Sequence, residues 1–342
     1  MKIIHLIPNL KNGGAENVLV NIALKIREQK IRQAIFTLEN ADQDFNFKKV
    51  QNKIEVFNLK NSSTKIKELI DTNPKAIVIC WLYKTFIYYE KIALIHNFKN
   101  KYYWNIRHSD FGIFQLKQKF LLLLLGIYSN FSGCGLVYCS ERSRIIHERY
   151  FFKRKNSIVI PNRLAKSPPK KINNPKEKNF ILFIGRKHPQ KNPKFLKKIF
   201  KHIELNYSNV SLVILGRGWT KQFFQTKSNK LIIYNQKENI FDYLSYTSCL
   251  LFTSKFGEGY PNVIAEAMAV GTTILGFDSG DYSLMTKNYE LAKTVSNEKE
   301  FLTELNHFIN LENINHSLNK IIESINKELD FELTIKQYLS LI

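Results

Sequence analysis

The chain has 342 residues, which is enough for two α/β domains of ordinary size. A hydrophobic content of 44% excludes global disorder, and a formal net charge of +22 indicates an anionic partner. The four cysteines form neither a Cys-x-x-Cys pair nor a cluster with histidine, which argues against disulfides and zinc and favours buried thiols in a reducing compartment.

The positive charge is concentrated in the first half of the chain. Residues 1–165 hold 27 Lys and Arg against 12 Asp and Glu, whereas residues 166–342 hold 24 against 17. A basic first half suits nucleic acid, an anionic membrane surface or a phosphorylated acceptor, and a solvated surface rich in Lys and Asn is the simpler alternative. Residues 1–8 lack the apolar length and the cleavage site of a signal peptide, which favours a cytoplasmic protein.

Apolar strand-like runs alternate with helical patterns along the chain, which predicts parallel sheets in an α/β fold. In the first half the expected strands lie near 2–8, 33–38, 54–58, 76–82, 102–106 and 135–139, and in the second near 180–184, 210–215, 230–234, 248–253 and 272–277. Pro, Asn and Lys crowd residues 161–175 without apolar periodicity, which predicts a linker between domains at 1–165 and 166–329.

The apolar run at 120–128 is the strongest in the chain, but it is far shorter than the ~20 residues that a spanning helix needs. One interpretation is a helix packed on a sheet. The other is a helix that dips into the inner face of the membrane, with Lys117 and Lys119 at the headgroups.

Two polar segments follow strands in the first half. Gly13 and Gly14 separate the first strand from a helix predicted at 15–30, so the backbone there can approach a ligand closely beside Glu16. A plain turn accounts for the glycines equally well. Arg107 and His108 end a later strand and would face a ligand from this half, although a histidine in such a loop is as often structural.

Cations and glycines follow two strands in the second half. Arg186 and Lys191 come after the strand at 180–184, and Asn192 is placed to cap a helix that begins with Pro193. A guanidinium and an ammonium at the carboxyl edge of a sheet can neutralise a diphosphate without a metal, and a solvated basic loop is the alternative. Gly216 ends the strand at 210–215, where a close turn can lie beneath a nucleotide.

The segment 256–271 follows the strand near 248–253 and carries two glutamates eight residues apart, Glu258 and Glu266. Glu258 lies in the loop and Glu266 about one turn into the predicted helix. The backbone amides of Asn262, Val263 and Ile264 at the helix start can bind an anion, while the carboxylates accept hydrogen bonds from sugar hydroxyls.

Taken in order over residues 3–282, these segments resemble glycosyltransferase family 4, a family of retaining, nucleotide-sugar-dependent enzymes with the GT-B fold. Glu258 and Glu266 match its Glu-x7-Glu signature, and residues 13–16 match its Gly-Gly-x-Glu loop. The resemblance implies two Rossmann-like α/β domains that face each other across a cleft, with a C-terminal helix at 330–342 that packs back on the N-terminal domain.

The resemblance also implies roles for individual side chains. Glu258 would hydrogen-bond the donor sugar and stabilise its developing positive charge, His108 would position the transferred sugar or the acceptor, and Glu16 and Arg107 would lie on the acceptor side. The remaining residues would bind the donor: Gly13, Gly14, Arg186, Lys191, Gly216, Asn262, Val263, Ile264 and Glu266. We expect neither a metal nor another cofactor.

The expected activity is transfer of a hexose or N-acetylhexosamine, with retention, from a nucleotide diphosphate sugar to a membrane-linked saccharide. We expect UDP as the nucleotide and an acceptor of O-antigen, capsule or lipopolysaccharide synthesis, with the protein peripheral on the inner face of the cell membrane. The sequence departs from the family at Arg163, Thr273 and Asp281, which leaves the sugar undefined.

Two other classes stay open. A GT-B epimerase or phosphorylase would use the same donors, but a phosphorylase needs a pyridoxal-phosphate lysine, for which the sequence holds no local signature. A basic nucleic-acid-binding protein would interleave cations with exposed aromatic residues and would not place Glu258 and Glu266 in its binding site, because carboxylates repel phosphate. We therefore expect no nucleic-acid partner.

Overall fold

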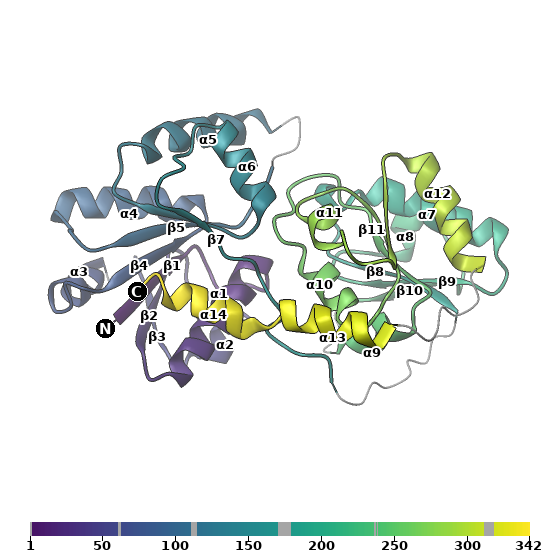
Figure 1. Cartoon of the computed structure of the whole chain (residues 1–342), viewed down its shortest axis with the longest axis horizontal. Coiled ribbons are helices and arrows are strands. Elements are labelled where there is room, and N and C mark those ends of the chain that lie inside the picture. The colour runs from purple at the N-terminus through teal and green to yellow at the C-terminus, as the bar shows by residue number, and fades with distance from the viewer. Residues whose placement is uncertain are drawn as a thin grey trace. The chain divides into compact units, whose positions relative to one another are not determined.

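The computed structural model describes residues 2–60, 63–110, 115–169, 179–235, 237, 239–310 and 318–342. The chain forms two compact units (Figure 1). Unit 1 comprises Met1–Ser109, Ile113–Ala165 and Phe331–Ile342, and unit 2 comprises Asp110–Gly112 and Lys166–Asp330. Residues 170–178, which include the last part of the linker predicted at 161–175, lie outside the described residues.

Unit 1 is a parallel α/β unit. Its elements in chain order are β1 (Lys2–Ile7), α1 (Gly14–Glu28), β2 (Arg32–Thr37), α2 (Phe47–Val50), β3 (Glu55–Asn58), α3 (Ser63–Asp71), β4 (Ile77–Trp81), α4 (Tyr83–His96), β5 (Tyr102–Ile106), α5 (Leu116–Ser129), β6 (Gly135–Tyr138), α6 (Glu141–Arg149), β7 (Ser157–Val159) and α14 (Phe331–Leu339). The strands form a seven-stranded sheet in the order β3-β2-β1-β4-β5-β6-β7, and each pair is parallel.

Helices cover both faces of this sheet. Figure 1 shows α4, α5 and α6 on one side and α1 and α14 on the other. The hydrophobic cluster beneath α1 includes Ile335, Tyr338 and Leu341 from the C-terminal segment. Polar contacts fix this segment further, since Asn105 donates to the Tyr338 hydroxyl at 2.7 Å and Thr334 donates to the Pro161 carbonyl at 2.8 Å.

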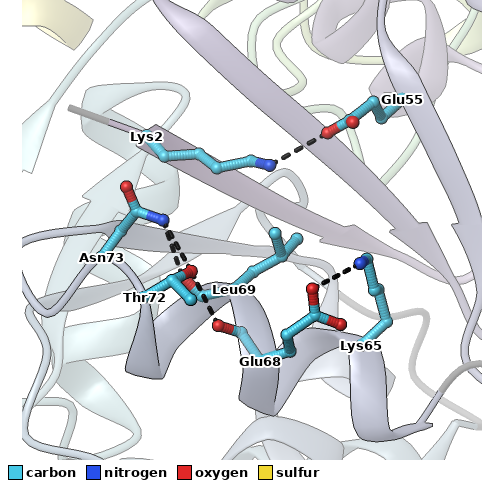
Figure 2. Close-up of polar contacts among 7 residues, drawn as sticks. All are labelled: Lys2, Glu55, Lys65, Glu68, Leu69, Thr72 and Asn73. Atoms are coloured by element: carbon cyan, nitrogen blue, oxygen red, sulfur yellow. Dashed lines mark hydrogen bonds and ion pairs between the residues drawn. The ribbon is translucent and has the colours of Figure 1, made fainter.

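Local ion pairs and helix-end hydrogen bonds stabilise the part of unit 1 that contains β3 and α3. Figure 2 shows the Lys2 ammonium on the Glu55 carboxylate at 2.9 Å and the Lys65 ammonium on Glu68 at 2.6 Å. At the end of α3 the Thr72 hydroxyl donates to the Glu68 carbonyl at 2.8 Å. The same carbonyl also accepts from the Thr72 backbone amide at 3.0 Å, and the Asn73 side chain donates to the Leu69 carbonyl at 3.2 Å, so side chains add to the hydrogen bonds at this helix end.

Unit 2 repeats the architecture with a second parallel sheet. Its elements in chain order are β8 (Phe180–Ile184), the short helix η1 (Pro189–Lys191), α7 (Pro193–Asn206), β9 (Ser211–Leu215), α8 (Lys221–Phe224), β10 (Leu231–Tyr234), α9 (Ile240–Tyr246), β11 (Cys249–Phe252), α10 (Asn262–Met268), β12 (Ile274–Phe277), α11 (Tyr282–Met285), β13 (Ala292–Val295), α12 (Glu298–Asn310) and α13 (Leu318–Glu328). The sheet order is β10-β9-β8-β11-β12-β13.

The predicted fold class and the predicted strands are confirmed. Continuous apolar runs such as 181–184 and 212–215 form central strands whose side chains are buried on both faces, as parallel sheets require. The four cysteines are free and buried. Two strands that we did not predict, β7 and β13, lie at the sheet edges, where only one side of the strand is paired.

The apolar run at 120–128 lies within α5, a surface helix of unit 1. Leu122, Leu125 and Gly126 are buried against the unit, whereas Phe120 and Leu124 on the opposite face are exposed. Among the described residues, no helix combines the length and the apolar character that crossing a bilayer requires.

Candidate functional site

The candidate site of unit 2 lies at the carboxyl edge of its sheet, around a partly buried ion pair. The Lys191 ammonium, at the end of η1, contacts Oε1 of Glu258 at 2.6 Å, and the two side chains are only 17% and 12% exposed. The same oxygen accepts a hydrogen bond of 2.8 Å from the Ser254 hydroxyl. A carboxylate held by two donors has little freedom, so the geometry fixes where Glu258 presents its charge.

The residues directly after β11 hold the Lys191–Glu258 pair in place. Ser254 and Thr253 are both buried, and the Thr253 hydroxyl donates to the Lys191 carbonyl at 2.7 Å. The Lys255 amide donates to the Gln190 carbonyl at 3.0 Å. The end of β11 thus holds both η1 and Glu258, and it couples two segments that are 67 residues apart.

A second loop packs against the Glu258 turn from the end of β12. The Asp281 amide donates to the Gly259 carbonyl at 3.0 Å. Gly280 has a φ of +62°, and a Cβ there would lie 2.4 Å from the Gly259 carbonyl oxygen and 2.7 Å from Cβ of Glu258. Glycine is therefore required at this position for both backbone conformation and space.

The ends of β8 and β9 approach each other through glycines. A Cβ on Gly216 would lie 2.0 Å from the Gly185 carbonyl oxygen, and the Trp219 indole donates to that same oxygen at 2.7 Å. Since backbone blocks the Gly216 position, no side-chain rotation can make room for a larger residue.

We expect Gly216→Ala to lower the free energy of unfolding by about 2 kcal/mol, because overpacking against a fixed backbone costs about 1–3 kcal/mol. Gly14→Ala is the matched control, since a Cβ there meets no atom within 4 Å. Calorimetric melting of the two variants measures the difference, and equal melting temperatures would show that the β8–β9 turn is not closely packed.

Arg186 lies beside this contact, and its side chain is exposed. No ion pair or hydrogen bond engages it among the described residues, so its guanidinium faces solvent as an uncompensated cation. Burial lowers the pKa of the neighbouring His188 imidazole, and the positive charges of Arg186 and Lys191 lower it further. The His188 side chain caps η1 by accepting from the Gln190 amide.

Glu266 lies one turn into α10 and differs from Glu258 in having no partner. Within the described residues its carboxylate makes no hydrogen bond and no ion pair, although the side chain is only partly exposed. Burial raises the pKa of this carboxyl from 4.5 to about 7. A carboxylate desolvated without compensation is a site that a hydrogen-bond donor from outside the chain can satisfy.

The sequence predicts that the backbone amides of Asn262, Val263 and Ile264 at the start of α10 can all bind an anion, and the structure fits this only in part. The Ile264 amide donates to the Pro261 carbonyl at 3.0 Å, because the first turn tightens there, and the Ile264 side chain is buried. Asn262 and Val263 are partly exposed. The predicted cap of α7 needs a correction too: Asn192 adopts a left-handed conformation at the helix start and makes no side-chain capping bond.

In unit 1 the candidate residues have local structural partners. A Cβ on Gly13 would lie 2.2 Å from a Glu16 carboxylate oxygen, which shows that Glu16 folds back over the start of α1. The Arg107 guanidinium donates to the side-chain carbonyl of Asn162 and lies over the Trp81 ring at 5.4 Å. These contacts give Glu16 and Arg107 structural roles whether or not they also bind a ligand.

His108 is partly exposed, and the Ser143 hydroxyl donates to its backbone carbonyl at 2.7 Å. This bond ties the end of the β5 loop to the start of α6. Within the part of the chain that the structure describes, no three His, Cys, Asp or Glu side chains come together in a group that could hold a metal ion.

Ser254, Thr253 and Trp219 are parts of the site that the sequence did not reveal. Thr253 and Ser254 directly follow the apolar run of β11. Polar residues at the carboxyl end of a central strand are a signal that could have identified these two residues. Trp219 carries no such signal, because its indole acts through the Gly185 backbone.

Known proteins are similar to this chain in sequence and in structure. Residues 166–325 match the family model described as glycosyl transferases group 1. The uncharacterized glycosyltransferase MJ1059 of Methanocaldococcus jannaschii is 27% identical over 179 residues, which are 48% of this chain and 44% of that protein. The matched segment therefore spans less than half of that relative.

Solved structures match the whole chain. Anabaena Alr3699/HepE in complex with UDP and glucose has a TM-score of 0.75 at 16% identity, over 99% of this chain and 98% of that chain. The lipopolysaccharide outer core galactosyltransferase WaaB has a TM-score of 0.71 at 19% identity, over 100% and 99%. The chain therefore has the fold of the GT-B structures, with two parallel-sheet α/β domains, and residues 166–325 are similar to the glycosyl transferases group 1 family.

Proposed function

We propose that the protein transfers a hexose or N-acetylhexosamine from a UDP-sugar to a membrane-linked saccharide, with retention of anomeric configuration. The observation that carries this proposal is the Lys191–Glu258 pair, held by Ser254 at the sheet edge of a glycosyltransferase group 1 domain. The complex of Alr3699/HepE with UDP-glucose supports a donor of this class.

The donor is bound by charges and by hydrogen-bonding groups of unit 2. The exposed Arg186 guanidinium and the Lys191 ammonium neutralise the diphosphate, so no metal is needed. The amides of Asn262 and Val263 add hydrogen bonds to phosphate oxygens. The unpartnered Glu266 accepts hydrogen bonds from the ribose hydroxyls, which repay the desolvation of its carboxylate.

In the reaction, an acceptor hydroxyl oxygen forms a bond to the anomeric carbon on the face from which the diphosphate departs. The bond from that carbon to the β-phosphate oxygen breaks, the electron pair leaves with the nucleotide diphosphate, and a phosphate oxygen takes the hydroxyl proton. Glu258 stabilises the positive charge that develops on the sugar ring. Because the Lys191 ammonium is paired with this carboxylate, the donor diphosphate competes for the ammonium on binding.

We assign the acceptor to unit 1. At the ends of β1 and β5, Glu16 and Arg107 lie on the acceptor side and His108 positions the transferred sugar or the acceptor, while Gly13 and Gly14 remain assigned to the donor. The structural match to WaaB, which is described as a lipopolysaccharide outer core galactosyltransferase, supports a saccharide of surface polysaccharide synthesis. Such acceptors are anchored in the anionic inner face of the membrane, where the net charge of +22 is favourable.

The proposal is tested by the melting temperature of the protein with UDP and with single-stranded DNA. We expect UDP at saturating concentration to raise it by several degrees and DNA to have no comparable effect. Glu266→Ala should weaken UDP binding by at least about tenfold, because hydrogen bonds to a charged group contribute about 1.5–3 kcal/mol. The exposed Glu290 supplies the control variant Glu290→Ala. Unchanged UDP binding in Glu266→Ala would remove the ribose assignment.

Affinity for UDP should also depend on pH through Glu266. Its folded-state pKa of about 7 exceeds the ordinary 4.5, so the native state keeps this proton between those values and loses stability as the pH rises through them. Donor hydroxyls favour the ionised carboxylate, so affinity should rise about tenfold between about pH 6 and pH 8. Titration calorimetry of Glu266→Gln isolates the titration of UDP itself, and an equal pH dependence in the variant would contradict the assignment.

A further inference from the structure

The outward face of α5 is apolar where a surface helix is ordinarily polar. Leu116, Phe120, Leu124 and Ile127 recur at helical spacing, and Phe131 lies two residues beyond the end of the helix. Leu116 is 72% exposed, Phe120 62% and Phe131 83%. The helix is nonetheless well seated, because a Cβ on Gly126 would clash with the Tyr150 carbonyl on its inner side. The apolar side chains are therefore exposed even though the helix itself is packed in place.

The neighbouring helix α4 extends this surface. The Tyr128 hydroxyl of α5 donates to the Glu90 carboxylate of α4 at 3.0 Å, so the two helices lie side by side. On α4, Leu94 is 85% exposed and Ile95 63%. We call the combined surface the α4–α5 face and define it by Leu94, Leu116, Phe120, Leu124, Ile127 and Phe131.

Cations without partners lie among these apolar side chains. Lys91 is on the same side of α4 as Leu94, and Lys117 is on the same side of α5 as Leu124. Both lysines are exposed, and neither makes an ion pair within the described ranges. Elsewhere in unit 1, lysines at the surface do pair with acids, as the partly exposed Lys65 does with Glu68 in Figure 2. The α4 and α5 helices contain one acid, Glu90, and it is not exposed.

We propose that the α4–α5 face is the surface by which unit 1 binds an anionic phospholipid bilayer. The apolar side chains would enter the boundary between headgroups and acyl chains, and Lys91 and Lys117 would lie among the phosphates. The wider segment 83–155 has 13 Lys and Arg against 4 Asp and Glu, so its charge is also complementary to such a membrane. This proposal rests on the proposed function only for its biological purpose.

A second copy of the chain fits this face less well. A two-fold interface places the same patch against itself, which would bring lysines toward lysines with no exposed acid on either helix to pair them. A nucleic acid would satisfy the lysines but would leave the aliphatic side chains in contact with water and phosphate. An anionic bilayer satisfies both kinds of side chain.

Co-sedimentation of the full-length protein with vesicles tests the proposal without any nucleotide. We expect binding to vesicles of phosphatidylcholine containing phosphatidylglycerol, and little binding to phosphatidylcholine alone. Phe120→Ser combined with Leu124→Ser should lower the partition coefficient by at least about tenfold. Leu205→Ser combined with Leu284→Ser is the matched control, since both leucines are exposed in unit 2. Its binding should equal that of the wild type.

The charge component is tested in the same assay. Lys91→Glu with Lys117→Glu should lower binding to the anionic vesicles by at least about 25-fold, since each lysine near the surface contributes about fivefold. Lys287→Glu with Lys299→Glu makes the same change in net charge at exposed positions of unit 2 and should change binding far less.

Three results would overturn the proposal: no vesicle binding by the wild type, wild-type binding by both variants of the α4–α5 face, or equal losses in the matched controls. Self-association of the wild type that Phe120→Ser and Leu124→Ser abolish, measured by light scattering, would assign the face to a second copy instead. UDP binding measured on each variant separates this question from the donor site, because these residues lie outside that site.

Discussion

Glu258→Gln is expected to lower kcat by about 10²–10³, the range that follows loss of one transition-state electrostatic group. Glutamine keeps the shape of the side chain and can still accept from Lys191 and Ser254, so the fold and the donor site should remain intact. Charge stabilisation of the sugar is lost, whereas binding of the nucleotide is not. We therefore expect the fall in kcat to exceed any rise in KM for the donor.

The matched control is Glu298→Gln. Glu298 is also on unit 2 and also pairs with lysines, Lys198 at 2.8 Å and Lys255 at 3.4 Å, but these contacts lie on the surface. Its replacement should leave kcat unchanged. Steady-state transfer or donor hydrolysis measures both variants, and a kcat for Glu258→Gln equal to that of the wild type would remove Glu258 from the mechanism.

Lys191→Met should affect both activity and stability. The substitution removes a diphosphate partner, so donor KM should rise and kcat should fall, and it leaves the Glu258 carboxylate without its cation. Since both side chains are mostly buried, we expect a loss of about 2 kcal/mol in the free energy of unfolding, below the about 3–5 kcal/mol of fully buried pairs. Chemical denaturation measures this loss.

The double variant Lys191→Met with Glu258→Gln tests whether the effects of these two residues on stability depend on each other. Lys191→Met alone leaves the Glu258 carboxylate without its cation, whereas the double variant leaves no charge at either position. We therefore expect the double variant to be more stable than Lys191→Met, although it carries one more substitution. Lys198→Met breaks the exposed pair with Glu298 and should cost under about 0.5 kcal/mol. Simple addition of the two single effects would show that Lys191 and Glu258 do not depend on each other.

The predicted interior of the fold agrees with the structure because its signal is local. Central parallel strands are buried on both faces, so runs such as 181–184 are apolar throughout and stand out in the sequence. The two edge strands that we did not predict, β7 and β13, lack this signal. β7 has only three residues and all are partly buried, and Lys293 and Thr294 in the middle of β13 are exposed, so neither strand has an apolar run long enough to recognise.

The candidate site was predictable in its parts but not in its contacts. Strand-end positions located Arg186, Lys191 and Glu258, because ligand-binding residues of α/β proteins gather there. Their pairing was not visible, since it joins segments far apart in the chain through the buried hydroxyls of Thr253 and Ser254. The missing cap at Asn192 depends on a left-handed backbone that residue identity alone does not specify.

The apolar run of α5 shows another limit of sequence patterns. Its leucines are continuous enough to suggest a buried helix, yet the helix is packed on one side only, and the exposed side is as apolar as the buried one. Periodicity cannot separate these outcomes, because a run that is apolar all round has no polar face to mark the solvent side.

The central claim is that unit 2 binds a nucleotide diphosphate sugar through Arg186, Lys191, Glu258 and Glu266. The most direct test incubates the protein with a panel of UDP-, GDP- and ADP-sugars and follows hydrolysis or transfer by mass spectrometry, beside the Glu258→Gln variant. We predict that the wild type consumes at least one donor and releases its nucleoside diphosphate, while the variant is nearly inactive. Failure of the wild type to bind or consume any donor of the panel would contradict the account.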